Sequence, residues 1–346
     1  MKGVVLPGNS TVELRDFERP QPGHGQVLLR MRASTICGSD IRAIYRQHLG
    51  IGAEAYQGVI AGHEPCGEVE EVGPGVRGLT IGDRVVVYHI GGCGFCDECR
   101  HGYMIGCHRP ERAAYGWQRD GGHAEHMVAD EVTCLRLPGE LTFLDGANVA
   151  CGFGTAYEAL LRARLSGRDQ LLVTGLGPVG LAVAMLGRAM GATRVVGTDV
   201  SAERRGLAQQ LRLVDDALDA TLVDGPALRA LADGGFEVAI DCSGSAEGRL
   251  AALEALRDWG RCIFVGEGGR VEFEVSPLLI HRQVTLHGSW VTSLRHMAEL
   301  LDRLVRWQLH PEQIVTHRFP LERAAEAYAV ADNGAAGKVA IVFEGP

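Results

Sequence analysis

A glycine-rich stretch at residues 171–199 constrains the fold of this chain more than any other feature. It reads LLVTGLGPVGLAVAMLGRAMGATRVVGTD: a strand-like apolar run, the pattern Gly-x-Gly-x-x-Gly, a helical segment and a second strand. The first glycine permits a tight turn, the second lets the backbone approach a pyrophosphate, and the third lets the helix pack against the strand. Free N–H groups at the start of such a helix attract phosphate. We therefore predict a dinucleotide site that includes Gly175, Gly177, Pro178, Val179 and Gly180.

The arrangement of the other segments indicates the fold class. From about residue 145 to 288, strand-like and helical segments alternate, which predicts parallel strands with right-handed crossovers. Residues 1 to about 150 read instead as short strands separated by turns. We expect helices at 246–259, 293–308 and 321–331 and a last strand at 338–343. With 346 residues, two domains are the natural expectation. The predicted fold is α/β, with an irregular β domain and a doubly wound parallel sheet.

Charge and hydropathy exclude several classes of partner. The chain has 34 Lys and Arg against 43 Asp and Glu, a net charge of -9, so no nucleic-acid partner is predicted. The uncharged run at 171–187 is shorter than the ~20 residues of a spanning helix and has Gly and Pro in its middle, so no membrane association is predicted. The first residues have too short an apolar run for a secretory signal, and we expect a cytoplasmic location.

Four of the ten cysteines lie within fifteen residues, in the spacing Cys-x2-Cys-x2-Cys-x7-Cys. This spacing brings four thiolates around one tetrahedral zinc ion. An iron–sulfur cluster is the rival interpretation, because closely spaced cysteines also bind such clusters. Four protein ligands leave no position for a substrate. We therefore predict a structural zinc held by Cys93, Cys96, Cys99 and Cys107.

A second metal site is predicted from residues that are far apart in the sequence. Cys37 lies in ICGSD, His63 and Glu64 lie in AGHEP, and Cys151 lies in VACGFG. Together they supply two thiolates and an imidazole beside a carboxylate. Three protein ligands and one exchangeable position are typical of a catalytic zinc.

With these motifs the chain resembles the zinc-dependent medium-chain dehydrogenases/reductases, the alcohol dehydrogenase superfamily, over nearly its whole length. It is most similar to the branch of threonine, polyol and related secondary-alcohol dehydrogenases. The resemblance implies a GroES-like β domain at 1–149 with 291–346, and a Rossmann domain at 150–290. The motifs that carry it are Cys37–Asp40, Gly62–Glu64, Gly82–Val85, the four-cysteine segment, Gly121–Glu125 and Gly175–Gly180.

The same resemblance implies roles for the residues of the second metal site. Cys37, His63 and Cys151 match the catalytic zinc ligands, and Glu64 matches an acid that can enter the coordination shell. The third ligand stays open between Cys151 and Glu64, since threonine and sorbitol members have Glu-Pro where this chain has Ala-Cys. Ser39 matches the hydroxyl that accepts the substrate proton. Arg42 occupies a relay position where some relatives have histidine.

The predicted cofactor is NAD, with zinc at two sites per chain. Asp199 ends the second strand, where a carboxylate binds ribose hydroxyls and repels a 2′-phosphate. Arg204 matches a family position that contacts the ribose. Alternatively, Arg204 and Arg205 are ordinary charged side chains on the solvent-exposed face of a helix. The ends of later strands, including Val265 and Gly266, are expected near the nicotinamide. The alternatives are an NADP(H)-dependent reductase of the same superfamily and a non-catalytic nucleotide-binding protein.

The expected substrate is a small polar secondary alcohol, such as a polyol, an amino alcohol or a sugar-like compound. His89 occupies a position that borders the substrate in related enzymes, and Trp117, ahead of the Gly121-Gly122 turn, is a second candidate for the pocket wall. Both also fit ordinary core or surface side chains. Dimers and tetramers are usual in the superfamily, and the apolar segment VTLHGSW suits pairing across a two-fold axis. We therefore expect a homo-oligomer.

Overall fold

A computed structural model describes residues 1–334 and 336–343 of the chain. They form two compact units: residues 1–154 with 292–334 and 336–343, and residues 155–291. Residues 335 and 344–346, which the first predicted domain includes, lie outside the described residues. In the described part of the chain, no helix has both the length and the apolar character that a membrane crossing requires.

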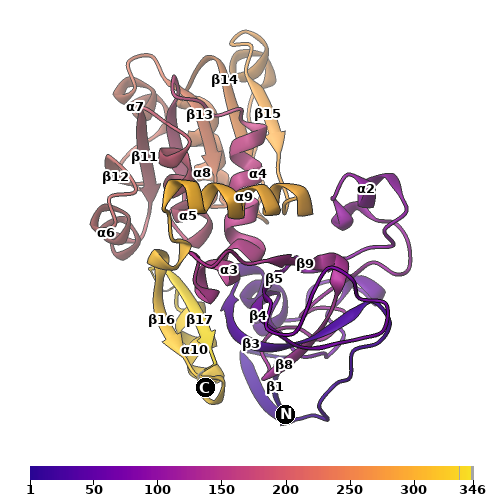
Figure 1. Ribbon diagram of the computed structural model, residues 1–346. Helices are drawn as coiled ribbons and strands as arrows, with labels where there is room; N and C mark the ends of the chain where they lie inside the picture. The colour runs from indigo at the N-terminus through magenta and orange to yellow at the C-terminus, as the bar shows by residue number, and fades with distance from the viewer. Residues whose placement is uncertain (335, 344–346) are drawn as a thin grey trace. The chain divides into compact units, whose positions relative to one another are not determined.

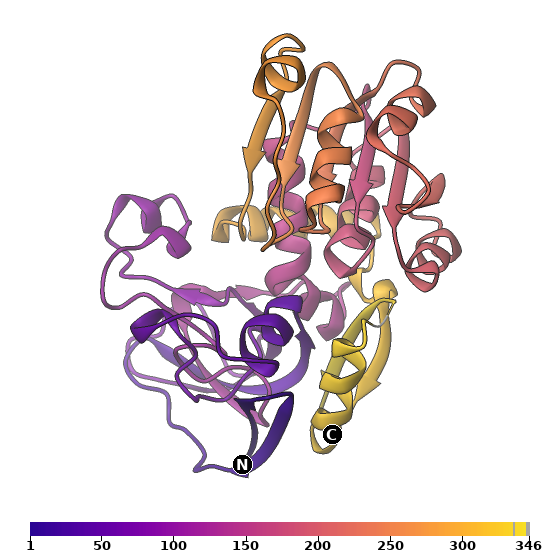
Figure 2. The same ribbon diagram turned by 180° about the vertical axis from the view of Figure 1, so that it is seen from behind.

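The second unit is built on a six-stranded parallel sheet (Figure 1). The strand order is β12-β11-β10-β13-β14-β15, the order of a doubly wound dinucleotide-binding sheet, in which ligands bind where the connections from β10 and β13 diverge. Figure 2 shows α8, in orange, lying over one face of this sheet. The elements are α4 (Gly154–Arg162), β10 (Gln170–Thr174), α5 (Pro178–Ala189), β11 (Arg194–Asp199), α6 (Ala202–Gln210), β12 (Asp216–Asp219), α7 (Gly225–Leu231), β13 (Phe236–Asp241), α8 (Ala246–Glu254), β14 (Leu256–Phe264) and β15 (Thr285–Gly288).

The first unit is built on a sheet in the order β16-β17-β3-β4-β5-β9, with β8 also paired to β3. Two small two-stranded sheets, β1-β2 and β6-β7, complete its irregular β character. The strands are β1 (Lys2–Gly8), β2 (Thr11–Asp16), β3 (Gln26–Ile36), β4 (Glu64–Val72), β5 (Arg84–Val87), β6 (Ile90–Gly91), β7 (Ala113–Ala114), β8 (His126–Asp130), β9 (Cys134–Arg136), β16 (Val315–Phe319) and β17 (Lys338–Val342). The helices are α1 (Gly38–Asp40), α2 (Asp97–Arg100), α3 (Phe143–Asn148), α9 (Leu294–Trp307) and α10 (Ala324–Asp332).

The C-terminal segment is an integral part of the first unit. Strand β17 pairs antiparallel with β3, which pairs antiparallel with β4 on its other side. Figure 1 shows β16, β17 and α10 together in yellow. Tyr328 and Ile341 share one hydrophobic core with Val4, Leu6 and Ile36 from the start of the chain. The last strand therefore places its side chains beside those of β3 and β4.

The architecture confirms the predicted α/β fold, but some local predictions were wrong. The helix expected at 246–259 ends at Glu254, and residues 256–264 continue as β14. The pairing of β14 with β13 overrides the helical sequence pattern. Trp259, within this strand, has φ +65, a value that a right-handed helix does not allow. Strand β12 and helix α7 were not predicted, because the stretch 216–231 has no clear hydrophobic period.

Candidate metal and cofactor sites

The glycines at 175–180 have different surroundings. Gly175 has φ +89, and a Cβ there would lie 2.7 Å from the backbone N of Ser243. A Cβ on Gly180 would strike the carbonyl oxygen of Gly175, so only glycine lets α5 start so close to the turn. A Cβ on Gly177 would meet only the Arg204 guanidinium, at 3.8 Å. The first turn of the twelve-residue helix α5 is therefore open to an anion.

Asp199 is buried at the end of β11, next to this turn. Its Oδ2 accepts the backbone N–H of Leu176 at 2.7 Å, and its Oδ1 accepts that of Ser201 at 2.8 Å. The Arg204 guanidinium lies 3.7 Å from Oδ2, whereas Arg205 donates to the Asp199 carbonyl at 2.8 Å. The two arginines thus differ: Arg204 lies beside the glycine turn, and Arg205 fastens the end of the strand. Each Asp199 oxygen keeps acceptor capacity for another donor.

Val265 and Gly266 lie where β13 and β14 end. The backbone N–H groups of both donate to the Asp241 carbonyl at 2.9 Å. Arg249 of α8 donates to the Gly266 carbonyl at 2.6 Å. A Cβ on Gly266 would strike the backbone N of Gly244, so the loops that follow these strands pack backbone against backbone. This arrangement places both residues at the carboxyl edge of the sheet.

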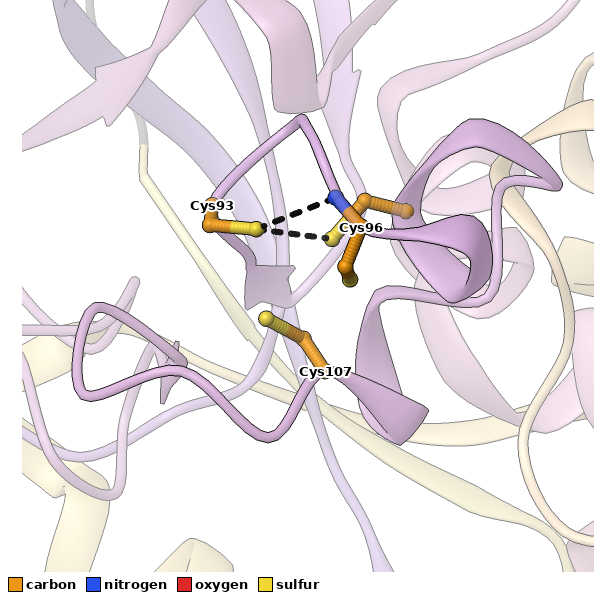
Figure 3. Close-up of side chains that lie close together, drawn as sticks. Cys93, Cys96 and Cys107 are labelled. Carbon is orange, nitrogen blue, oxygen red and sulfur yellow. Dashed lines mark hydrogen bonds between the residues drawn. The ribbon is translucent and has the colours of Figure 1, made fainter.

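The four-cysteine lobe, residues 93–107, brings all four thiols together, with their sulfurs within 4.8 Å of one another. Figure 3 shows the sulfur of Cys107 beside that of Cys93, with the Cys96 N–H pointing at the Cys93 sulfur. The N–H groups of Phe95 and Cys96 donate to Cys93 Sγ at 3.4 Å and lower the pKa of this thiol to about 6. Burial raises the pKa of Cys99 to about 12. The donor set fits a closed tetrahedral zinc site.

The second predicted cluster also assembles. A ligand atom from each of Cys37, His63, Glu64 and Cys151 lies within 4.8 Å of the other three. Among the residues that the structure describes, this cluster and the lobe are the two groups able to hold a metal. The Cys37 and Cys151 thiols hydrogen-bond each other, which lowers the pKa of Cys37 well below its ordinary value and raises that of Cys151. Soft sulfur and imidazole donors of this kind suit zinc.

One buried carboxylate orients two of these groups. Asp40 Oδ2 accepts the backbone N–H of Cys37 at 2.9 Å, and Oδ1 lies 2.7 Å from His63 Nδ1. Burial alone would lower the pKa of His63, but Asp40 raises it well above the ordinary value. Because Nδ1 is held by Asp40, Nε2 is the ring nitrogen left for a metal.

Glu64 is held by a buried lysine that sequence reasoning did not identify. Lys338 Nζ lies 2.9 Å from Glu64 Oε1 and 2.6 Å from Oε2. Thr35 Oγ1 donates to Oε2 at 2.6 Å, and the Gly152 N–H donates to Oε1 at 3.3 Å. Burial alone would lower the pKa of Lys338, but Glu64 raises it, so we treat the two groups as an ion pair.

Strand register explains how the cluster forms. Thr35 of β3 is the antiparallel partner of Glu64 on β4 and of Ala340 on β17. Cys37 follows β3 directly, and Lys338 begins β17, so all of these residues gather at one end of three adjacent strands. Cys151 comes from a π-helical turn, 149–153, between α3 and α4. Such widened turns occur frequently at functional sites.

The predicted substrate residues lie beside this cluster. The ring centroid of His89 is 5.2 Å from that of His63, and that of Trp117 is 6.5 Å away. Ser39 Oγ lies 3.5 Å from His63 Nε2. Arg42 lies half-buried in a π-helical turn at 41–45. The structure therefore brings His89, Trp117 and Ser39 close to His63.

Sequence reasoning missed the supporting residues Asp40, Thr35 and Lys338. Asp40 stands in the recognised Cys37–Asp40 motif, so its position was a usable signal. Lys338 had a weaker signal, a lysine at the start of an otherwise apolar final strand. Thr35 had none, because its contact with Glu64 depends on the pairing of β3 with β4.

The fold and the two metal-ligand clusters define a metal-dependent oxidoreductase with a dinucleotide-binding sheet, and comparisons with known proteins agree. Residues 23–139 match the alcohol dehydrogenase GroES-like domain, and residues 178–306 match the zinc-binding dehydrogenase family. The chain belongs to the zinc-type alcohol dehydrogenases of the medium-chain dehydrogenase/reductase superfamily. The resemblance predicted from the sequence is thereby confirmed.

Individual relatives cover almost the whole chain. The uncharacterized zinc-type alcohol dehydrogenase-like protein YphC of Escherichia coli K12 is 51% identical, over 99% of each chain. The L-threonine 3-dehydrogenase of Shewanella frigidimarina is 30% identical over 95% of each chain. Among solved structures, alcohol dehydrogenase TADH from Thermus sp. ATN1 superposes with a TM-score of 0.89 at 28% identity, covering 99% of this chain and 100% of the other.

Proposed function

We propose that the protein is a zinc-dependent alcohol dehydrogenase that oxidises a polar secondary alcohol with NAD⁺. One observation carries the proposal: Cys37, His63 and Cys151 converge at one point, while the adjacent Glu64 is occupied by donors from the protein. Three ligands and one open position suit a catalytic metal, whereas the closed lobe suits a structural one. We therefore propose two zinc ions per chain, with Cys151 rather than Glu64 as the third catalytic ligand.

The residues around the cluster support proton removal from an alcohol. An aliphatic alcohol with a pKa near 16 costs on the order of 12 kcal/mol to ionise at pH 7, and zinc supplies the Lewis-acid charge that offsets this cost. Ser39 is positioned to accept the substrate proton through its hydroxyl. A general acid–base group contributes about 10²- to 10⁴-fold, so Ser39 alone falls short. Arg42 has no acceptor atom and cannot continue the relay, so Ser39 would pass its own hydroxyl proton on to water or to a cofactor ribose hydroxyl.

NAD⁺ is the proposed hydride acceptor because Asp199 ends β11, where the ribose of a dinucleotide binds in such sheets. Its carboxylate is buried and pinned by two backbone N–H groups, so it cannot easily turn away from a 2′-phosphate. A close charge pair at intermediate dielectric is worth ~4 kcal/mol, which disfavours NADP. Arg204 lies near enough to Asp199 to share in ribose binding.

His89 supports a substrate with a second hydrogen-bond donor. Its Nδ1 lies 2.9 Å from the Ala150 carbonyl and must donate to it. Burial lowers the pKa of His89 to about 4, so the ring is neutral at pH 7 and Nε2 is an acceptor. A neighbouring hydroxyl or ammonium group can donate to Nε2, whereas a carboxylate cannot. Polyols and amino alcohols therefore fit better than long aliphatic alcohols.

A homo-oligomer is proposed from the edge of the second unit. Strand β15 is the last strand of its sheet, and Trp290 and Ile280 near it are largely exposed. Unpaired edge strands with apolar neighbours tend to pair with another chain. Light scattering on the purified protein distinguishes a monomer from a dimer or tetramer.

The test combines metal analysis with a substrate panel. Polyols, amino alcohols including L-threonine, and a long aliphatic alcohol are each offered with NAD⁺ and with NADP⁺, and cofactor reduction is measured. About two zinc ions per chain and NAD⁺ reduction with a polar secondary alcohol are expected. Activity with NADP(H) and one zinc would instead favour the reductase. Binding of NAD⁺ without turnover of any alcohol would favour a non-catalytic nucleotide-binding protein.

A further inference from the structure

The buried lysine is unusual for this chain. Of its 34 lysine and arginine residues, only Lys2 and Lys338 are lysine. Lys2 is exposed and its ammonium lies 3.5 Å from Asp16. Lys338 is buried, with a side chain that is 3% exposed, and lies against Glu64. The chain thus uses arginine almost everywhere except at the cation next to the metal ligands.

The carboxylate of Glu64 has no acceptor capacity left. An ionised carboxylate offers about four lone-pair positions, two on each oxygen. Oε1 accepts from Lys338 and from the Gly152 N–H, and Oε2 accepts from Lys338 and from Thr35. Four donors therefore fill four positions, and Lys338 supplies a donor to each oxygen.

This saturation matters because Glu64 is itself a competent zinc ligand. One of its oxygens lies within 4.8 Å of the ligand atoms of Cys37, His63 and Cys151. Carboxylate oxygens bind zinc at about 2.0–2.2 Å, so a small shift of Glu64 would make it the fourth ligand. A site closed by Glu64 would have no position for an alcohol.

We propose that Lys338 is a positioning residue that holds Glu64 out of the fourth coordination position and so keeps that position open to substrate. The inference rests on the proposed function and deepens it. Lys338 also offsets charge, because its ammonium cancels the charge of the Glu64 carboxylate beside the metal ligands. Without it the site is more negative by one unit, which opposes binding of an anionic alkoxide.

The ion pair lies close to the segment that carries Cys151. The Cβ position of Gly152 lies 3.7 Å from Glu64 Oε1 and 3.9 Å from Lys338 Nζ, so the pair lies against the backbone next to this ligand.

The experiment is a double-mutant cycle with Lys338→Met, Glu64→Gln and the two combined, and Lys2→Met as the matched control. Each variant is loaded with Co²⁺ in place of zinc. The visible bands of Co²⁺ depend on the identity and number of its ligands, so they report whether the Glu64 carboxylate coordinates the metal. The lobe cancels in difference spectra because no substitution touches it. Metal content and kcat with the best alcohol from the substrate panel are measured in parallel.

In Lys338→Met the metal is expected to stay bound. The cobalt bands are expected to change because Glu64 then coordinates the metal, and kcat is expected to fall about 10- to 100-fold. The combined variant is expected to match Glu64→Gln in spectrum and in kcat, because a glutamine amide is a poor competitor for the metal. Lys2→Met should match the wild-type protein.

An equal loss of kcat on removing Lys338 from the wild-type protein and from the Glu64→Gln variant would overturn the inference, because Lys338 would then act independently of Glu64. An unchanged cobalt spectrum in Lys338→Met would also overturn it. If Lys338→Met does not fold, the comparison between Glu64→Gln and the combined variant decides. Failure of the proposed function is separate: it would appear in the wild-type protein, as a missing second zinc or as no alcohol oxidation.

Discussion

The two metal-ligand clusters of this protein are assembled in opposite ways. The lobe takes all its ligands from fifteen consecutive residues, and its sulfurs are fixed by short turns and backbone N–H groups. The open cluster takes Cys37, His63 and Cys151 from three separate segments and depends on Lys338, 274 residues beyond Glu64. A closed site needs only local geometry, whereas a site that must keep one position open needs neighbours that hold its competing groups away.

The largest expected difference between the clusters concerns turnover. Cys37→Ser should lower kcat by several orders of magnitude. Without the metal, the pKa of the alcohol is no longer lowered, and a bound metal can lower such a pKa by up to about nine units. Zinc should fall from about two to about one per chain. NAD⁺ binding, measured by calorimetry, should be unchanged. Full activity in this variant would show that the open cluster is not catalytic.

The matched change in the lobe should act on stability instead. Cys96→Ser also removes one zinc, but kcat of the folded protein should stay within a few-fold of wild type. Loss of a structural metal costs about 4 kcal/mol, or about 10 °C in the thermal midpoint of a unit of this size. Scanning calorimetry and initial rates on the same sample check this result. A drop in kcat as large as that of Cys37→Ser would remove the distinction between the clusters.

A smaller effect should distinguish the acidic residues that lie next to the ligands of the two clusters. Asp40→Asn removes the carboxylate that orients Cys37 and His63, so zinc affinity at the open cluster should fall about 10- to 100-fold. Competition with a coloured chelator measures this release. The control is Asp97→Asn, an exposed acid next to Cys96 in the lobe, which should leave both zinc ions in place.

The smallest effect is a difference in acid sensitivity. Burial lowers the pKa of His123, which packs against Gly62, to about 4, whereas His101 and His108 of the lobe are exposed. The unfolded chain takes up a proton near pH 6.5 and the folded chain does not. His123 therefore reduces stability as the pH falls from about 6.5 toward 4, by about 2 kcal/mol at pH 5.

Urea denaturation at pH 7 and pH 5 measures this loss. His123→Phe should reduce the difference between the two pH values by about that amount, and His101→Phe should not. An equal effect of both substitutions would contradict the assignment to the buried ring.

The same contrast explains what the sequence could predict. The lobe was predicted from spacing alone, and the glycine turn from its place between a strand and a helix. The ligands Cys37, His63 and Cys151 were grouped because their residue types suit an open zinc site, and the resemblance to a known family then supported that grouping. Thr35 and Lys338 were not predicted, because their contacts follow from the pairing of β17 with β3 and of β3 with β4. Such register is set by the packing of the whole unit.

The position of Lys338 near the end of the sequence has a consequence for synthesis. At about 5–20 residues per second, a ribosome needs roughly 10–40 s to proceed from Cys151 to Lys338. During that interval the ligands of both clusters already exist, but Glu64 lacks its partner from the last strand. The nascent chain can complete the ligand set of the lobe early, whereas a metal ion that reaches the other cluster early meets a carboxylate that Lys338 does not yet hold. Correct loading of that cluster should therefore be a late event, completed when β17 joins the sheet.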